Sequence, residues 1–329
     1  KLSDELELSI EQEILAPAPS TGVSPDKIGK ATRIDDARGR YIEYAKQSVG
    51  PGDLAGMKIV VDCGHGAAYL LAPLIFKELG AKVVKLGVEP DGLNINEGCG
   101  ALHPEHAGRV VREQGADLGI SFDGDADRVI FTDETGTTVS GDRILTLCAL
   151  ALMEEGKLRG STMACTVMSN LGLHEALRTA GISVLTTAVG DRHVIEALRT
   201  KGFSFGGENS GHLIFADHAT TGDGILSALQ VLRIMKRRGR RLSELAQVMR
   251  EYPQRLVNLK VRAKPPLETL PALQAALREA DADFGPLGRH LIRYSGTENK
   301  VRILVEHRDA VVVEAWSARL RSVIEQAIA

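Results

Sequence analysis

Several features that define other protein classes are scarce or missing in this sequence. Only four of its 329 residues are cysteine, and no two stand at C-x-x-C spacing, which argues against a disulfide framework and against a zinc site. No apolar run reaches the roughly 18 residues that a membrane-spanning helix needs, and no signal peptide is evident. We therefore expect a protein of the reducing cytoplasm that does not contact a membrane.

A large excess of charge of one sign is also missing. The formal net charge is -3, so no global basic field would draw the chain to nucleic acid, and no such partner is expected. The one basic run, residues 236–241, follows an apolar helical stretch and contains Gly239. Cations and a glycine at this place are typical of a helix C-terminal cap, which we prefer to the alternative of an anion-binding patch.

The residues that are present alternate between short β-branched segments and amphipathic ones. Strands predicted at 58–62, 82–86 and 117–122 are separated by helices, and a second series begins near Gly141. This rhythm is typical of mostly parallel sheets with helices on their faces. After Pro253 the order changes to strand, helix, two strands and helix. The fold class is therefore predicted to be α/β, with two three-layer α/β/α domains and a small C-terminal α+β domain that has a largely antiparallel sheet.

The first residues are predicted to form an additional helix. Within residues 1–15 an apolar residue recurs at every fourth position: Leu2, Leu6, Ile10 and Ile14. Because this helix has nothing before it to pack on, we expect that the chain begins partway through a domain. The predicted domains are residues 1–17, 18–138, 139–253 and 254–329.

An acidic loop follows the apolar strand that ends at residue 122. Asp123, Asp125 and Asp127 alternate with small residues, so that their oxygens can meet one cation, and Arg128 adds a positive group suited to phosphate. An EF-hand is one alternative, but its sixth position should be glycine, and strands rather than helices flank this loop. A plain acidic turn is the other alternative, although three close carboxylates would repel one another without a cation.

A glycine-rich polar loop lies at residues 206–212. Glu208 and Ser210 offer hydrogen bonds that suit sugar hydroxyls, and His212 could donate to phosphate or relay a proton. Upstream, Asp191 is interpreted as a helix N-cap, and Arg192 could face the same cleft as Glu208. An ordinary surface loop is the alternative.

A third polar loop, residues 293–299, lies between two strands of the last domain. Arg293, Ser295, Gly296 and Thr297 provide a guanidinium, hydroxyls and a backbone N–H, which are the donors that an anion-binding nest uses. Arg302 returns in the next strand. An ordinary hairpin loop is the alternative.

Taken together, these loops resemble those of one family. The acidic loop, the GENSGH sequence at 207–212 and the RxSGTE pattern at 293–298 occur in this order and spacing in the α-D-phosphohexomutases. The stretches at 28–43, 168–170 and 190–192 resemble the branch of the family that acts on glucosamine phosphates. The resemblance covers essentially the whole chain.

The resemblance implies a four-domain enzyme with one cleft where all domains meet. A phosphoserine of the first domain would give its phosphoryl group to the substrate, and the bisphosphate intermediate would return one from its other end. In this branch, glucosamine 6-phosphate becomes glucosamine 1-phosphate, on the route to UDP-N-acetylglucosamine and peptidoglycan. One Mg²⁺ per chain and glucosamine 1,6-bisphosphate are the implied cofactors. The implied partner is a hexosamine phosphate substrate, and a homodimer is compatible with this interpretation.

The resemblance also assigns roles by position. Asp123, Asp125 and Asp127 would bind Mg²⁺, and Arg128 and His212 would act at the reacting centre. Contacts to the sugar and to the phosphate that is not reacting would come from a larger set of residues: Arg192, Glu208, Asn209, Ser210, Arg293, Ser295, Gly296, Thr297 and Arg302.

Two departures from the family pattern carry consequences. Ala126 stands where the family usually has glycine, which is tolerable unless the position needs a positive φ. No Ser-His-Asn sequence, the motif of the family's phosphoserine, occurs anywhere in the chain. We therefore expect residues 1–17 to be a remnant of the first domain and the chain alone to be inactive. A phosphomannomutase or phosphoglucomutase is the nearest alternative, and a non-catalytic sugar-phosphate-binding protein is a more distant one.

Overall fold

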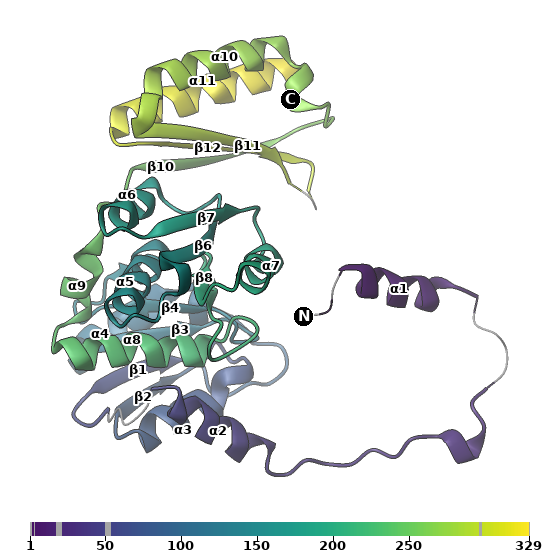
Figure 1. Ribbon diagram of the computed structural model, residues 1–329, viewed down its shortest axis with the longest axis vertical. Coiled ribbons are helices and arrows are strands. Elements are labelled where there is room, and N and C mark those ends of the chain that lie inside the picture. The colour runs from purple at the N-terminus through teal and green to yellow at the C-terminus, as the bar shows by residue number, and fades with distance from the viewer. Residues whose placement is uncertain (1, 3, 18–21, 50–53, 296–297, 329) are drawn as a thin grey trace. The chain divides into compact units, whose positions relative to one another are not determined.

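The computed structural model describes residues 2, 4–17, 22–49, 54–295 and 298–328, and the chain divides into two compact units (Figure 1). Unit 1 consists of Lys1–Met168 and Ile182–Ala246, and unit 2 consists of Ser169–Gly181 and Gln247–Ala329. Helix α1 (Asp4–Leu15) confirms the predicted first helix, and apolar side chains of its stripe, such as those of Ile10 and Ile14, are exposed.

The first sheet of unit 1 is mixed rather than mostly parallel. Its strand order is β2 (Lys82–Leu86), β1 (Lys58–Asp62), β3 (Leu118–Phe122), β4 (Val129–Thr132) and β5 (Thr138–Val139). The pairings of β1 with β2 and β3 are parallel, whereas β3–β4 and β4–β5 are antiparallel. The antiparallel half arises because the chain turns back at residues 123–128 without the helical crossover that a parallel pair requires.

Helices cover this sheet because its strands bury side chains on both faces. On α4 (Pro104–Gln114), Ala107 and Val111 pack with Val60 of β1 in one apolar cluster. Helix α3 (Leu71–Glu78) contacts β2, and α2 (Ala37–Gln47) contacts both α3 and α8 (Gly224–Arg238).

The second sheet of unit 1 has the order β7 (Ser183–Thr187), β6 (Thr162–Thr166), β8 (Phe205–Gly207) and β9 (Leu213–Phe215). Successive glycines of β8 face opposite helices. A Cβ at Gly206 would lie 3.0 Å from Val194 of α7 (Asp191–Lys201), and a Cβ at Gly207 would lie 3.0 Å from Leu145 of α5 (Gly141–Glu154). Helix α8 contacts both β4 and β9 and therefore joins the two sheets.

The basic run is a helix cap, as predicted. Helix α8 ends at Arg238, and Gly239 follows with left-handed backbone. Arg238 pairs with Glu154 at 2.7 Å, Arg240 pairs with Glu244 at 3.0 Å, and Lys236 donates to a backbone carbonyl. These cations are thus engaged within the fold.

Unit 2 contains a three-stranded antiparallel sheet with the order β10 (Gln254–Lys260), β12 (Lys300–His307) and β11 (Gly288–Tyr294). Helices α10 (Pro271–Phe284) and α11 (Ala310–Ile328) bury one of its faces, with Leu273, Ile303 and Leu320 in the core. This arrangement confirms the predicted C-terminal α+β domain.

Helix α6 (Leu171–Thr179) belongs to unit 2, although it lies far from the rest of this unit in sequence. The backbone N–H of Leu171 donates to Glu306 of β12 at 2.7 Å, and Asn170 exchanges two hydrogen bonds with the backbone of Tyr252. Arg289 pairs with the same Glu306 at 2.6 Å. The compact units therefore divide the chain differently from the predicted domain boundaries, which remain a prediction.

The remaining elements are short. They are α9 (Leu242–Leu245) and the 3-10 helices η1 (Pro25–Lys27), η2 (Ala67–Tyr69), η3 (Gly100–Leu102), η4 (Arg159–Ser161), η5 (Ala246–Val248), η6 (Leu267–Thr269) and η7 (Gly285–Leu287).

The sequence also predicts a strand at residues 203–205, and in the structure this strand begins two residues later. Strand β8 starts at Phe205 and runs through Gly206 and Gly207, which the sequence had suggested to be loop residues, and β9 was not expected as a strand. Glycine fits here because the Cβ of any other residue at position 206 would lie 2.6 Å from the carbonyl oxygen of Ala164.

Candidate active site

Three aspartates meet at the turn that joins β3 to β4. Asp123 follows the last residue of β3, and Asp125 and Asp127 continue at every second position. Oxygens of the three carboxylates lie within 4.8 Å of one another. Since antiparallel strands flank the turn, the EF-hand alternative does not apply.

Burial and mutual repulsion act together on these carboxylates. Asp123 is 8% exposed, and burial raises the pKa of its carboxyl, with further increases from the charges of Asp127 and Asp125. Arg128 acts in the opposite direction, because its backbone N–H donates to Asp123 Oδ1 at 3.1 Å and its guanidinium lies 3.6 Å from Oδ2. Asp127 Oδ1 is buried and accepts no hydrogen bond from the described residues. Three oxygen donors with few protein partners fit a hard divalent cation such as Mg²⁺.

The backbone of the acidic turn is held from two sides. Ala67 donates its N–H to the Gly124 carbonyl at 2.8 Å, and Gly224, the first residue of α8, donates to the Ala126 carbonyl at 2.9 Å. Gly66 packs so closely on Gly124 that a Cβ at position 66 would lie 2.3 Å from its oxygen. Ala126 has φ +62°, so this position is one where the glycine typical of the family would avoid strain.

The glycine-rich loop is the turn between β8 and β9. The Glu208 N–H donates to the His212 carbonyl at 2.8 Å, and the Gly190 N–H donates to Glu208 Oε1 at 3.0 Å. Asn209 donates its side-chain amide to the Met168 carbonyl at 3.4 Å, and Ser210 is exposed. The loop is thus a closed hairpin, in which one carboxylate oxygen of Glu208 and the amide of Asn209 already have backbone partners.

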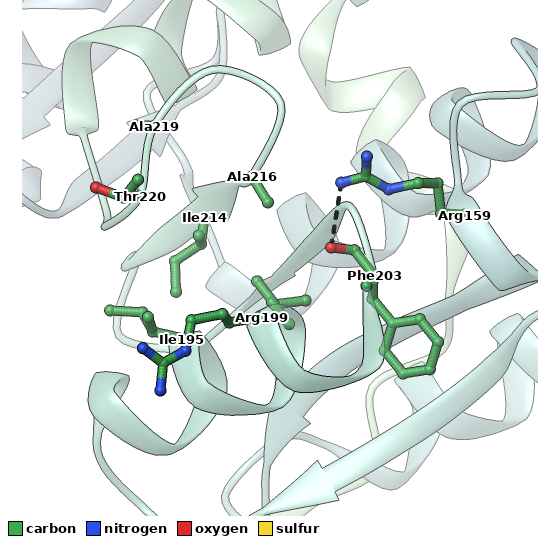
Figure 2. A pocket seen from close by; sticks show the side chains of 10 residues that line it. Arg159, Ile195, Arg199, Phe203, Ile214, Ala216, Ala219 and Thr220 are labelled. Carbon is green, nitrogen blue, oxygen red and sulfur yellow. Dashed lines mark hydrogen bonds between the residues drawn. The ribbon is translucent and has the colours of Figure 1, made fainter. Parts of the chain in front are cut away.

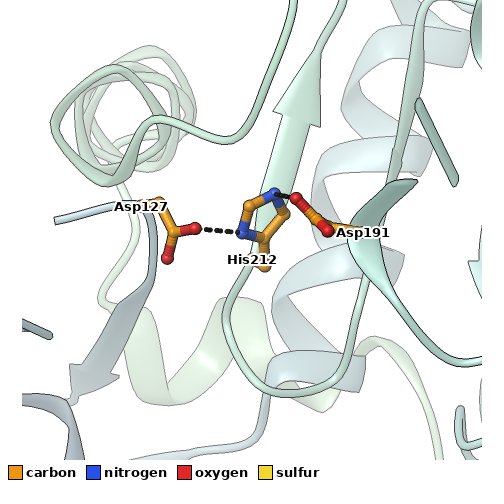
Figure 3. Close-up of side chains that lie close together, drawn as sticks. All are labelled: Asp127, Asp191 and His212. Carbon is orange, nitrogen blue, oxygen red and sulfur yellow. Dashed lines mark ion pairs between the residues drawn. The ribbon is translucent and has the colours of Figure 1, made fainter. Parts of the chain in front are cut away.

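His212 connects this hairpin to the acidic turn, which the sequence did not indicate (Figure 3). The imidazole is 1% exposed and lies between two carboxylates, with Nδ1 at 3.2 Å from Asp127 Oδ2 and Nε2 at 3.7 Å from Asp191 Oδ2. Gly222 makes room for it, since a Cβ there would lie 2.3 Å from Nε2. This position fits the proton relay better than direct donation to a phosphate.

The interpretation of Asp191 as an N-cap is wrong by one residue. Gly190 caps α7, whereas Asp191 is the first helical residue, and its carboxylate reaches His212. Arg192 follows in the first turn and is exposed, with its N–H donating to Asp191 Oδ1 at 2.8 Å.

The loop before α8 contains a true N-cap. The Asp223 carboxylate accepts the Leu226 N–H at 2.9 Å and also accepts the Tyr41 hydroxyl at 2.9 Å. Burial raises the pKa values of both Tyr41 and Asp223. Because Gly224 holds Ala126, this cap fixes the helix end that supports the acidic turn.

The third predicted loop lies in unit 2, between β11 and β12. Gly296 and Thr297 lie outside the described residues. Ser295 is buried and its Oγ accepts the Glu298 N–H at 3.3 Å. Arg293 and Arg302 stand directly opposite each other on the paired strands, and Arg302 Nε is buried without a hydrogen-bond partner among the described residues. Glu298 lies 3.9 Å from the Arg302 guanidinium, and its single negative charge offsets only part of the repulsion between the two facing arginines.

Comparisons with known proteins show the family of the chain. Three profiles of the phosphoglucomutase/phosphomannomutase family match the chain: domain II at residues 39–136, domain III at 140–252 and the C-terminal domain at 256–323. A phosphoglucosamine mutase of Geotalea daltonii is 50% identical over 331 residues, which cover 100% of this chain and 73% of the relative. The chain belongs to the phosphoglucosamine mutases of the phosphohexomutase family.

Other phosphoglucosamine mutases are similarly close. That of Anaeromyxobacter dehalogenans is 50% identical over 339 residues, covering 100% of this chain and 74% of the relative. Among solved structures, a phosphoglucomutase/phosphomannomutase family protein of Burkholderia thailandensis is 27% identical with a TM-score of 0.73, covering 88% of this chain and 64% of that one. The chain thus spans about two thirds to three quarters of the length of its relatives.

A more distant structure shares the fold alone. The N-acetylphosphoglucosamine mutase of Aspergillus fumigatus, crystallised with GlcNAc-6P and magnesium, is 22% identical with a TM-score of 0.72. Across the described residues of the chain, no helix combines the length and apolarity needed to cross a membrane.

Proposed function

We propose that this chain supplies the metal, sugar and phosphate sites of an enzyme that interconverts glucosamine 6-phosphate and glucosamine 1-phosphate through a phosphoserine and a 1,6-bisphosphate. The observation that carries the proposal is the convergence of Asp123, Asp125 and Asp127 at one turn, tied to the glycine-rich hairpin by His212. The chemistry needs positioning and charge neutralisation more than covalent work by side chains. The amino-sugar substrate and the cytoplasmic location follow from the family and are part of the proposal.

The three aspartates would hold one Mg²⁺, which neutralises charge on the transferring phosphoryl group when it is bound. Arg128 is anchored to Asp123 and half exposed, so its guanidinium can contact the same phosphoryl group. His212 would hold or pass a proton between Asp127 and Asp191 at the edge of the site.

The remaining contacts would come from two loops. Glu208 Oε2 and the Ser210 hydroxyl have no hydrogen-bond partner among the described residues and suit sugar hydroxyls, with Asn209 and Arg192 beside them. Arg293, Ser295 and Arg302 of unit 2, together with Gly296 and Thr297, would grip the phosphate that is not reacting. Support for this clamp comes from the facing arginines, because a dianion between them would relieve their repulsion.

A phosphoryl donor is not identifiable among the 329 residues, since no Ser-His-Asn sequence occurs in them. Ser121 precedes the acidic turn but is fully buried within β3. We therefore expect the chain alone to bind substrate without turning it over. Assembly of the enzyme as a homodimer is compatible with this proposal.

Calorimetry and a coupled mutase assay on the purified 329-residue chain test the proposal. We expect Mg²⁺-dependent binding of glucosamine 1,6-bisphosphate and no turnover of glucosamine 6-phosphate. Stronger binding of glucose or mannose 1,6-bisphosphate would point to a different hexose. Turnover would show that the nucleophile lies within the chain, and absence of all binding would refute the assigned sites.

A further inference from the structure

A cavity apart from the candidate active site lies in unit 1, on the face of the second sheet that α7 covers (Figure 2). It measures about 300 Å³ and is enclosed by the C-terminal half of α7, by β9 and by the segment that follows β9. None of its lining residues was assigned to the metal, sugar or phosphate sites. At ~30 Å³ per water-sized group, it would hold a ligand of roughly ten non-hydrogen atoms.

The lining of the cavity is apolar where it is buried and polar where it is exposed. Its apolar lining consists of the buried Leu198 and Ile214 and the half-buried Ile195, Phe203 and Ala216. The charged and hydroxyl side chains that line it, those of Arg159, Arg199 and Thr220, all belong to exposed residues. A ligand would therefore place an apolar body inside and a polar group at the mouth.

The two arginines differ in how they are engaged. Arg159 already pairs with Asp217 at 2.9 Å and donates to the Phe203 carbonyl at 3.5 Å. The Arg199 side chain forms no hydrogen bond or ion pair with any described residue. A charge at the end of α7 is favourable by itself, yet Lys201 satisfies this preference equally well without lining the cavity. Arg199 is thus the cation at the mouth that is available to a ligand.

We propose that this cavity binds a small organic carboxylate with an apolar alkyl or aromatic body. A sugar phosphate does not fit, because the buried and half-buried lining offers apolar side chains rather than hydrogen-bond donors for hydroxyls. The free guanidinium of Arg199 selects an anion over a neutral amphiphile, since charge-assisted hydrogen bonds are about twice as strong as neutral ones.

The cavity shares its supporting elements with the candidate active site. Helix α7 begins with Asp191, which contacts His212, and β9 starts at the residue after His212. The segment after β9 carries Ala219 of the cavity and Gly222, which packs on the His212 ring. Occupancy of the cavity would stiffen the elements that hold His212, so the site has the position of an effector site. The binding itself does not depend on the proposed function.

Decanoate is a suitable probe, because it combines a ten-carbon chain with one carboxylate. In calorimetry on the 329-residue chain we expect a Kd of ~0.1–1 mM, as ligand efficiencies of small molecules suggest. Decan-1-ol should bind several-fold more weakly, and acetate should not bind. Equal binding of decanoate and decan-1-ol would overturn the proposed anion recognition.

Four variants locate the binding. Arg199→Gln should weaken decanoate about tenfold, whereas the matched control Lys201→Gln, on the same helix end, should stay within twofold of the parent. Ala216→Leu should fill the cavity and abolish binding, with Ala219→Leu as a second filling variant if the first fails to fold by circular dichroism. Parent-like affinity in a folded filling variant, or equal losses in both cation variants, would overturn the proposal.

Discussion

The acidic turn of unit 1 and the hairpin of unit 2 that joins β11 to β12 both connect antiparallel strands. They differ in where their charged groups lie. In the acidic turn, the charged groups lie on the turn itself, and the carbonyls of Gly124 and Ala126 are fixed by donors from two other elements. In the hairpin of unit 2, the charged groups Arg293 and Arg302 lie on the regular strands beside the turn.

The proposed ligands would account for this difference by their size. A small cation requires oxygens that converge to within a few ångströms, so the backbone that carries short aspartates must be rigid. A phosphate is larger and can be reached by long guanidinium side chains from ordinary strands. In both regions like charges lie close together without a partner from the described residues that neutralises them fully, as binding of the proposed ligands would require.

Removal of one carboxylate should have the largest effect. We expect Asp125→Asn to weaken Mg²⁺, or Mn²⁺ as a spectroscopic substitute, by about 100-fold or more, because one of three charged ligands is lost. Electron paramagnetic resonance of bound Mn²⁺ measures this directly. The exposed Glu113→Gln on α4 is the control, and an unchanged Mn²⁺ affinity in Asp125→Asn would remove the turn from consideration as a metal site.

Removal of one arginine should be nearly as damaging to the enzyme but harmless to folding. In a version of the enzyme that turns over, Arg293→Ala should lower kcat/KM by roughly 10- to 150-fold, the range for losing a charge-assisted phosphate contact. The melting temperature should not fall, because the substitution also removes the repulsion from Arg302. Arg321→Ala on α11 is the matched control, and parent-like kinetics for Arg293→Ala would exclude it from the site.

Lowering the pH should affect ligand binding at the acidic turn but not at the arginines of unit 2. Burial raises the pKa of Asp123, so protons compete with the metal at a higher pH than at an ordinary aspartate, and Mg²⁺ affinity should fall as the pH is lowered towards that pKa. Because the folded state holds this proton more tightly than the unfolded state, the metal-free protein should lose stability as pH rises through that pKa. Sulfate binding at the arginines should not change over this range, since guanidinium stays charged. Parallel titrations with Mg²⁺ and sulfate check both expectations, and equal pH dependence would contradict the comparison.

The smallest effect concerns the left-handed residue of the acidic turn. Ala126→Gly should stabilise the protein by about 1 kcal/mol or less, because it relieves the strain of φ +62° but increases the freedom of the unfolded chain. Thermal melts should show a small rise in melting temperature. Ala67→Gly, where φ is not positive, should lower it instead, and a fall for Ala126→Gly would show that the turn gains from the alanine side chain.

Much of the fold could be predicted, because β-branched segments such as β1 and β2 have the bounds that their sequence suggested. Strand β9 was missed because Leu213–Phe215 is three residues long and wholly buried, so no alternation exists to detect. Strand β8 was misplaced because its two glycines suggest a loop, whereas their role is to let α5 and α7 approach the sheet.

The three loops were found from the sequence, but not the contact that joins two of them. Asp127 and His212 lie 85 residues apart, and only the joint packing of the two sheets through α8 brings them to 3.2 Å. Similarly, the sequence indicated that Ala126 would be strained only if its φ were positive. The sign of that φ depends on the donors from Ala67 and Gly224.

The distribution of thiols gives the molecule an internal reporter. Cys63 and Cys99 lie near the first sheet, Cys148 and Cys165 lie in or beside the second, and all four are buried and free. Burial raises the pKa values of Cys63 and Cys148 to about 12, so alkylating reagents will meet almost no thiolate while the sheets stay closed. Residues 247–329 contain no cysteine. Mass spectrometry of alkylated peptides can therefore time the opening of each sheet of unit 1 separately, without any engineered label.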